Sequence, residues 1–285
     1  MNNRIKYRKL KDKIFHGVIF AVTCIGIIIL FILMLDILRK GIPWLTQTFF
    51  TGFPSRFPNR SGILPGIVGS AYIILLTVIF AVPVGLGCAI YLEEYAKNNG
   101  LTRFIKINIS NLSGTPSIVY GLLGLAVFVR TLALKKSILS GSLTMSLVVL
   151  PIVIVASQEA IRAVPQFLRH GSYALGATKW QTIRKVVLPV AFPGILTGVI
   201  LSVSRALGES APLIMVGAAT FVSFLPKNVM DNFTALPMQI YYWTGLPKND
   251  FRELAAAGII VLLALLLTTN AAAIILRNKY QKNVE

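Results

Sequence analysis

Arg205 and Glu209 place two opposite charges, four positions apart, inside an otherwise apolar stretch, residues 195–213. A charge in the core of a bilayer costs roughly 2.5–3.5 kcal/mol on insertion scales. Residues four apart on a helix share one face, so both charges are predicted on one polar face of a membrane helix. Such a face is typical of a route for charged cargo. The alternative interpretation is a structural ion pair that pins neighbouring helices.

The order of the two charges favours the first interpretation. Glu ahead of Arg is the better helical arrangement, and here Arg comes first, which leaves Arg205 freer to meet another group. Its guanidinium is always charged and presents a planar fork to two oxygens of an oxyanion such as phosphate. Gly208 and Pro212 are predicted to loosen or kink the helix around it. Glu209 is predicted to moderate the attraction, so that cargo can leave again.

The composition predicts an integral membrane protein. Of 285 residues, 55% are hydrophobic and 13% are charged, with a mean hydropathy of +0.73, and a soluble chain of this length would carry more charge. A net charge of +18 would suggest nucleic acid for a soluble chain, but the positive-inside rule explains it here, so no nucleic-acid partner is expected. Cys24 and Cys88 lie in apolar runs without metal-ligand spacing, so no disulfide, metal or cofactor is expected.

Six stretches are apolar enough to span a bilayer. They cover residues 16–38, 67–92, 113–132, 139–157, 190–219 and 255–276. The first exceeds a signal-peptide core in length and lacks a small-residue cleavage site, so it is predicted to be retained. With the N-terminus in the cytoplasm, 17 Lys and Arg lie in cytoplasmic segments and 10 in outer ones, which favours an N-in and C-in topology.

The predicted fold class is therefore an all-α membrane protein with six transmembrane helices. Its parts are a basic cytoplasmic N-terminus, the first helix with an external loop, a transmembrane domain and a cytoplasmic tail. They cover residues 1–15, 16–66, 67–276 and 277–285. The connection 220–254 is rich in proline and in aromatic residues. Because aromatic residues prefer the level of the lipid headgroups, part of this connection is predicted to dip toward the membrane.

Two local predictions concern polar residues at span ends. Asn111 or Ser113 is predicted to cap the third span, with Pro116 in its first turn; a gate at this point would rest on analogy alone. Four glutamates in predicted loops or span ends are expected to be solvated. They are Glu93, Glu94, Glu159 and Glu253.

The cytoplasmic segment 158–189 has the strongest local signals. Gly176 suits the left-handed position just after a helix, and Thr178 with Gln181 fits a capping box that starts the next one. The pattern predicts a helix, a glycine corner and a short amphipathic helix. Its apolar side chains are predicted to dock into a partner's groove; the alternative is a segment resting on lipid headgroups, with Lys179 near anionic lipid.

This segment resembles the loop of permease subunits in ATP-binding-cassette (ABC) importers. Their pattern is EAA, three residues, Gly, nine residues, Ile, one residue and Leu-Pro. LGATKW (175–180) followed by VVLP (186–189) matches its second half, with Val for Ile. The EAA positions hold His170, Gly171 and Ser172 instead, so the glutamate of the pattern is missing.

Five blocks in order resemble the PstA-type permeases of phosphate importers, over most of the chain from Pro65 onward. They are GTPSIVYGL (114–122), YALGATKWQT (173–182), PGILTGVIL (193–201), RALGESAP (205–212) and FTALPMQIY (233–241). Ser210 stands where that family usually has Thr, which keeps the hydroxyl.

The resemblance implies a type I ABC importer permease fold in the plasma membrane of a prokaryote. The chain would form half of the route for inorganic phosphate, and the resemblance implies three kinds of partner besides membrane lipid. These are a second permease of PstC type, a cytoplasmic ATPase dimer of PstB type and an external phosphate-binding protein of PstS type. The chain has no P-loop, so it is not expected to be an enzyme, and ATP hydrolysis is expected in a separate subunit.

The implied site residues fall into two groups. The substrate-pathway residues are Arg205, Glu209 and Ser210. The ATPase-coupling residues are Leu175, Gly176, Ala177, Thr178 and Trp180. Two alternatives stay open: a permease for sulfate, molybdate or phosphonate, and a membrane scaffold that moves nothing.

Overall fold

The computed structural model describes residues 2–218 and 221–281, and within these ranges every regular element is a helix. The long α-helices are α1 (Asn2–Gly41), α3 (Leu64–Ile90), α6 (Ile138–Arg162), α9 (Leu188–Gly208) and α12 (Asn249–Gln281). The shorter ones are α2 (Gln47–Thr51), α4 (Gly100–Ser113), α5 (Ser117–Gly124), α7 (Gln166–Ala174), α8 (Lys179–Thr182), α10 (Ala211–Val216) and α11 (Leu236–Thr244). The π-helical turns η3 (Tyr91–Tyr95), η4 (Leu125–Thr131) and η5 (Ile183–Val187) continue α3, α5 and α8, and the 3-10 turns η1 (Ile42–Trp44) and η2 (Pro58–Arg60) lie between α1 and α3.

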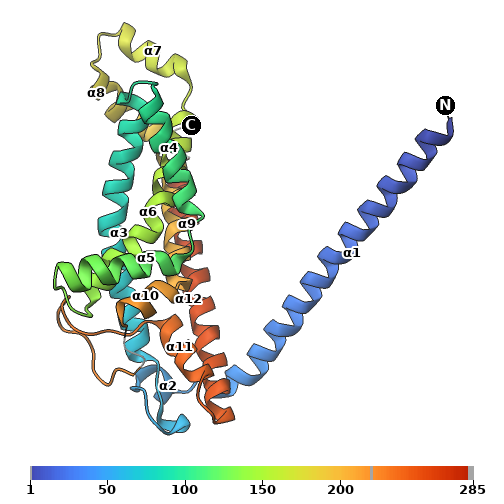
Figure 1. Cartoon of the computed structure of the whole chain (residues 1–285), viewed down its shortest axis with the longest axis vertical. Coiled ribbons are helices and arrows are strands. Elements are labelled where there is room, and N and C mark those ends of the chain that lie inside the picture. Colours follow the sequence, from blue (N-terminus) through green and yellow to red (C-terminus); the bar gives the residue numbers. More distant parts are fainter. Residues whose placement is uncertain (1, 219–220, 282–285) are drawn as a thin grey trace.

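Helices α3, α6 and α9 form the centre of the bundle (Figure 1). Small residues let their backbones approach closely. A Cβ added at Gly85 of α3 would lie 2.7 Å from Val153 on α6, and one at Gly194 of α9 would lie 2.7 Å from the Cβ of Ala160. Buried hydroxyls also link α3 to α6. Close packing and interhelical hydrogen bonds of this kind hold helices together in a membrane.

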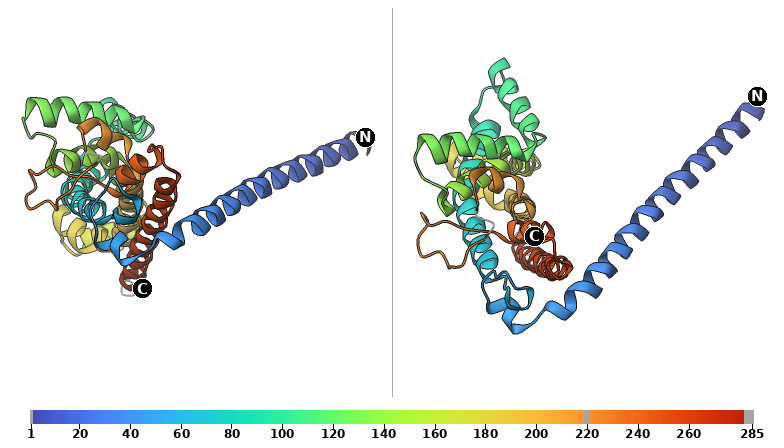
Figure 2. Two further views of the ribbon diagram at one scale, coloured as in Figure 1. Left: turned by 90° about the horizontal axis from the view of Figure 1, so that it is seen from below. Right: turned by 60° about the horizontal axis from the view of Figure 1, so that its bottom comes forward.

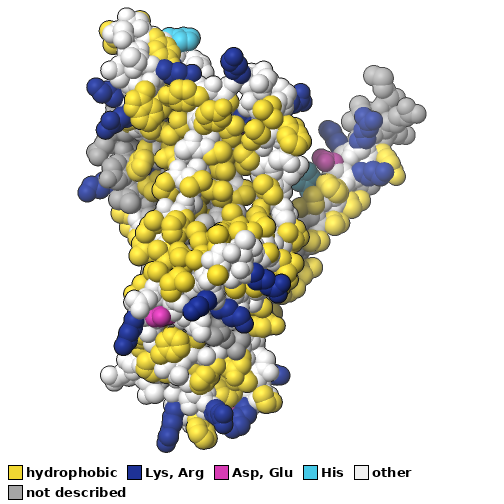
Figure 3. Space-filling model, turned by 60° about the vertical axis from the view of Figure 1, so that its left-hand side comes forward, with side chains coloured by type: hydrophobic (Ala, Val, Ile, Leu, Met, Phe, Trp, Pro, Cys, Tyr) yellow, Lys and Arg dark blue, Asp and Glu magenta, His cyan; other side chains and the backbone are white. Residues whose placement is uncertain are grey.

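The surface has the layout of a membrane protein. On the face in Figure 3, hydrophobic side chains form a broad band across the molecule, and Lys and Arg gather above and below it. Within the described residues, five helices are long and apolar enough to span a bilayer, and a sixth span exists if α4 and the helix formed by α5 and η4 count as one. The prediction of six spans is confirmed in this sense.

The third span is bent, and the prediction of one helix over 113–132 is wrong. The axes of α4 and the α5–η4 helix differ by 102°. The break lies before Pro116, whose ring disfavours a helical conformation of the residue ahead of it. The Tyr120 hydroxyl donates to the carbonyl of Leu112 at 2.8 Å across the bend. Asn111 and Ser113 belong to α4, so neither caps α5, where Pro116 stands at the N-cap position.

The fifth span is broken as well. The prediction places one helix over 190–219, but α9 ends at Gly208 and α10 begins at Ala211; residue 219 lies outside the described residues. Pro212 has no N–H for the helix ladder, and its ring would clash with the carbonyl of Gly208 if the helix continued. Glu209 adopts an extended conformation (φ −81°, ψ 124°). A predicted kink is thus a complete break.

Helix α1 stands away from the bundle (Figures 1 and 2). Its apolar side chains from Ile14 to Leu35 are mostly exposed. Contact with the rest of the chain begins at its C-terminal end, where Gly41 packs against the backbone of Ala256 on α12. The N-terminal end of α1, α7, α8 and the C-terminal end of α12 lie at one end of the molecule. The predicted N-in and C-in topology requires this arrangement and stays a prediction.

The opposite end of the bundle is closed by α2, α11 and the start of α12. Trp243 is almost fully buried there, and its ring lies 6.1 Å from that of Phe49 on α2. Tyr241, two positions earlier, is exposed. The aromatic residues of the predicted connection 220–254 therefore divide between the core and the surface. The predicted tail 277–285 lies partly outside the described residues.

Candidate functional site

Arg205 and Glu209 lie at the break in the fifth span, not on one helix face as predicted. Arg205 is in the last turn of α9, and Glu209 is the residue that ends the helix. The Nε of Arg205 lies 3.4 Å from Oε1 of Glu209. The preference for Glu ahead of Arg therefore does not apply, because the helix ends between them. The pair forms through the turn of the chain instead.

The guanidinium of Arg205 remains open. Its side chain is 40% exposed and that of Glu209 is 21% exposed. Among the residues that the structure describes, Glu209 is its ionic partner, and the contact uses Nε. Both terminal nitrogens of the fork are thus available to an oxyanion, since guanidinium binds such groups through pairs of N–H donors.

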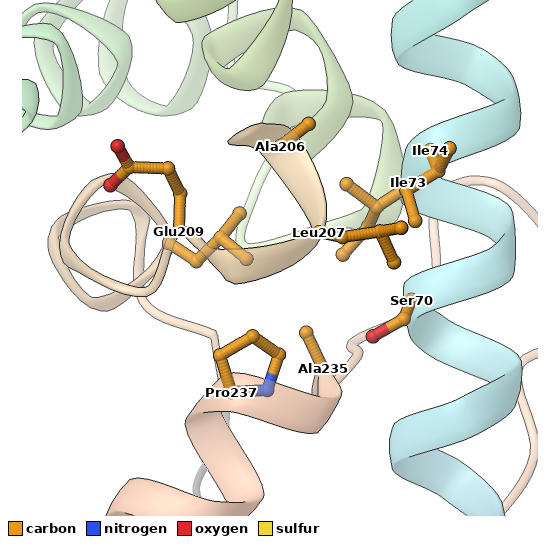
Figure 4. Close-up of a pocket in the computed structure, with 9 residues that line it drawn as sticks. Ser70, Ile73, Ile74, Ala206, Leu207, Glu209, Ala235 and Pro237 are labelled. Atoms are coloured by element: carbon orange, nitrogen blue, oxygen red, sulfur yellow. The ribbon is translucent and has the colours of Figure 1, made fainter. Parts of the chain in front are cut away.

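A small cavity adjoins the break. Figure 4 shows its residues, which come from α3, the end of α9, α10 and the start of α11: Ser70, Ile73, Ile74, Ala206, Leu207, Glu209, Leu213, Ala235 and Pro237. Its volume of about 10 Å³ has room for one water molecule at most. The carboxylate of Glu209 points away from Ser70 and Pro237. Arg205 does not line the cavity.

Ser210 follows Glu209 directly and stands at the N-cap of α10. Its carbonyl accepts the N–H of Ile214 at 3.0 Å. The hydroxyl makes no hydrogen bond with any residue in ranges 2–218 and 221–281, and the side chain caps no N–H of α10. The structure thus brings the three predicted pathway residues together in one short break between two helices.

The predicted segment 158–189 contains the end of α6, then α7, a turn, α8 and η5. Gly176 has φ +80°, the left-handed conformation predicted for it. The side chain of Thr178 caps α8, and Oε1 of Gln181 accepts the N–H of Thr178 at 2.8 Å. These two bonds confirm the predicted capping box. The hydroxyls of Ser172 and Thr182 lie 2.9 Å apart, so α7 and α8 are held as a pair, residues 166–182, called here the α7–α8 pair.

The tip of the α7–α8 pair is apolar and exposed. Leu175 is 90% exposed and Trp180 is 53% exposed, and Phe167 and Tyr173 are exposed beside them. Ile183 of η5 is fully buried in the bundle. Of the five predicted coupling residues, Leu175, Gly176, Thr178 and Trp180 are exposed, and Ala177 is half-buried. This surface can dock into a groove or rest on a lipid surface.

A known family matches most of this chain. Residues 81–282 match the family described as "Binding-protein-dependent transport system inner membrane component". The chain belongs to this family. The chain is similar to the "Probable ABC transporter permease protein YqgI" of Bacillus subtilis, 36% identical over 75% of this chain and 72% of the relative. The "Phosphate transport system permease protein PstA" of Pasteurella multocida is 31% identical over 90% of this chain and 91% of the relative.

Solved structures of ABC transporters share the fold of this permease. A chain of the bacterial alginate ABC transporter, in complex with its alginate-bound periplasmic protein, superposes with a TM-score of 0.68 at 15% identity, covering 95% of this chain and 96% of the other. The inward-facing MetNI methionine ABC transporter gives 0.62 at 16% identity, covering 76% and 95%. The permease is a multi-pass protein of the cell membrane, and membership implies a partner permease, an ATPase and a substrate-binding protein.

Two carboxylates of this permease were missed in the sequence. Glu93 and Glu94 on η3 were predicted to be solvated, but their side chains are only 11% and 8% exposed. Glu93 Oε1 accepts from Lys106 at 2.8 Å and from Arg162 at 3.0 Å. Glu94 Oε1 accepts from Arg169 at 3.0 Å. Two adjacent carboxylates at the end of an apolar span need cations nearby, and that signal could have found them.

The other two glutamates differ from each other in exposure. Glu159 is exposed, as predicted, and pairs with Arg162 on its own helix. Glu253 is half-buried and accepts from the Trp44 indole at 2.9 Å, which ties the chain after α1 to α12. His170 stands at the EAA position that holds glutamate in related loops, and it is exposed on α7. The residue before it, Arg169, is the buried one.

Proposed function

We propose that this chain is the permease subunit of an ATP-driven importer of inorganic phosphate. The observation that carries the proposal is the open guanidinium of Arg205 at the break of a membrane span. A cation in such a place is a binding site for a passing anion by default. The phosphate permeases among the relatives, which match nearly the whole chain, support phosphate as the cargo.

The arrangement suits an anion that must be held and then released. Arg205 offers two terminal nitrogens to two phosphate oxygens. Glu209 holds the third nitrogen, Nε, and its negative charge weakens the attraction, so that the anion does not stay. The Ser210 hydroxyl stands next to Glu209 and is free to donate to a third oxygen. These three residues are our proposed pathway.

The same proposal gives the α7–α8 pair a partner. Leu175 and Trp180 are hydrophobic anchors that stand out from the bundle, and an exposed apolar patch of this kind marks an interaction site. We place the cytoplasmic ATPase dimer, of PstB type, on this patch. The second permease is then of PstC type and the external binding protein of PstS type. Closure of the ATPases would move the α7–α8 pair and widen the small cavity beside Glu209.

Phosphate uptake tests the pathway. Cells that lack this chain are rescued with the wild type or with Arg205→Lys, and uptake of labelled phosphate is measured. Lys keeps the charge but loses the planar fork, so uptake by Arg205→Lys is expected to fall about tenfold. Normal uptake would exclude the bidentate site. Competition by sulfate, molybdate and a phosphonate decides the cargo, because the rival anion would compete better than unlabelled phosphate.

Cross-linking tests the docking site. Cys24 and Cys88 are replaced by Ser, and a cysteine is placed at Leu175, the most exposed anchor. The control cysteine is at Asn228, which is exposed near the opposite end of α6. Leu175→Cys is expected to cross-link to the ATPase and Asn228→Cys is not. A Leu175→Cys that reacts with lipid-bound reagents alone would favour the membrane-surface alternative, and intact uptake by Arg205→Ala with failed assembly would favour a scaffold.

A further inference from the structure

The last turn of α3, the π-turn η3, is held to the α7–α8 pair by a buried ion pair. Nε and Nη2 of Arg169 on α7 donate to Oε1 of Glu94 at 3.3 and 3.0 Å. Both side chains are less than a tenth exposed. Two charge-assisted donors that converge on one carboxylate oxygen hold the guanidinium in a defined position relative to Glu94.

The other donors of Arg169 reach a third element. Nη1 donates to the carbonyl of Val164 at 2.6 Å, and Nη2 also donates to the carbonyl of Ile161 at 2.9 Å. Ile161 is in the last turn of α6 and Val164 lies just after that helix, in the region where a helix leaves carbonyls without intrahelical partners. One guanidinium therefore joins α3, α6 and α7 in a single buried joint.

A second contact repeats the link from the other helix of the pair. The Lys179 ammonium of α8 lies 4.8 Å from the ring centre of Tyr95, which is the last residue of η3. This distance is in the range of a cation–π interaction. Both helices of the α7–α8 pair thus hold the same turn of α3.

Helix α9 needs no such joint. It follows the α7–α8 pair directly in the chain through η5, so a displacement of the pair reaches α9 through the backbone. Helix α3 is joined to the pair by side chains, namely this joint and the apolar contacts around Ala89. At their other ends, α3 and α9 supply facing walls of the cavity at Glu209, with Ser70 on one and Leu207 on the other.

We propose that Glu94 is a positioning residue for transport, which passes the displacement of the α7–α8 pair to α3. Without it, α3 would follow the pair only through the weaker contacts of Tyr95 and Ala89, so ATPase closure would move one wall of the cavity more than the other. The π-turn is a suitable site, because such turns occur where helices change register at functional positions. Helix α3, at about 1.5 Å per residue, carries the displacement about 30–36 Å from Glu94 to the residues that line the cavity. The inference rests on the proposed docking of the ATPase on this pair.

The test uses the complete transporter in liposomes, with phosphate uptake and ATP hydrolysis measured in the same vesicles. Glu94→Gln removes the charge and keeps the shape. The phosphate moved per ATP hydrolysed is expected to fall about fivefold or more while hydrolysis continues. Glu94→Asp keeps the charge and is expected to remain within about twofold of the wild type.

The matched control is Glu93→Gln. Glu93 is on the same π-turn and equally well bonded, but its partners are Lys106 of α4 and Gln158 and Arg162 of α6, none of them in the α7–α8 pair. Its ratio of phosphate to ATP is expected to stay within about twofold of the wild type. An equal fall for both variants would overturn the inference and make the joint merely structural.

Two further outcomes are decisive. An unchanged ratio in Glu94→Gln, or loss of the ATPase from the purified variant complex, also overturns the inference. If Glu94→Gln does not fold, Arg169→Lys, which keeps the charge but cannot reach three acceptors at once, is measured in its place with the same expected fall. A wild-type complex that hydrolyses ATP without moving phosphate would sink the proposed function itself, which separates the two failures.

Discussion

Among the Arg–Glu pairs of the described residues, Arg169–Glu94 and Arg205–Glu209 differ in almost every respect. Arg169 and Glu94 are 75 positions apart in the chain, and both side chains are buried. Arg205 and Glu209 are four positions apart and partly exposed, with a single contact at 3.4 Å. The first pair joins helices. The second stands at a break between two helices, where a membrane span is interrupted.

The difference lies in how many donors are occupied. The guanidinium of Arg169 donates to one carboxylate and two carbonyls. A further ligand could bind to it only by displacing one of these contacts between helices. Arg205 engages Nε, and an anion can approach its other nitrogens at little structural cost. A fully bonded pair of charges is thus suited to transmit force, and a partly bonded pair is suited to bind and release a ligand.

The largest expected effect is on stability, at the fully bonded pair of Arg169 and Glu94, called here the closed pair. Arg169→Ala leaves Glu94 buried without its partner, which is expected to lower the free energy of unfolding by about 3–5 kcal/mol. Denaturant unfolding of the purified complex measures it. Arg162→Ala, which removes a more exposed arginine from Glu93, is expected to cost about 0–1 kcal/mol. A loss from Arg205→Ala as large as that from Arg169→Ala would erase the distinction between the pairs.

The next largest effect is on transport, at the partly bonded pair of Arg205 and Glu209, called here the open pair. Arg205→Ala removes both donors offered to the anion, and hydrogen bonds to charged groups contribute about 1.5–3 kcal/mol each, so uptake is expected to fall by at least about a hundredfold. Labelled phosphate uptake measures it, and the amount of assembled complex in the membrane is the control. Reduced assembly in proportion to reduced uptake would contradict a pathway role.

The smallest effect concerns the acidic half of the open pair. Glu209→Gln removes the charge that weakens binding, so phosphate is expected to be held longer. Both the maximal uptake rate and KM are expected to fall, the rate by about tenfold or less. Concentration series of phosphate uptake separate the two parameters. A raised KM would mean that Glu209 assists binding, contrary to our interpretation.

Much of the fold was predictable because its signals are local. The apolar length of the spans, the left-handed Gly176 and the capping box at Thr178 each depend on a few neighbouring residues. The breaks before Pro116 and Pro212 were harder, because a proline in a membrane helix can produce a kink or a full break. Packing against other helices decides which.

The closed pair could not be predicted in the same way. Glu94 and Arg169 meet because η3 after α3, the end of α6 and the first half of α7 lie together in the fold, which no local pattern contains. The open pair was found in the sequence because a charge in an apolar run is conspicuous by itself. Its geometry was only partly predicted, since residues 206–208 stay helical but the chain leaves the helix at Glu209, which adopts an extended conformation.

The contact between Gly41 at the end of α1 and Ala256 of α12 has a consequence for biogenesis. Helix α1 is made first, and its binding surface on α12 is made last. At about 5–20 residues per second, roughly 10 to 40 seconds pass between the two on the ribosome. During that time α1 cannot contact α12. Its exposed apolar side chains therefore first contact lipid or another subunit in the membrane.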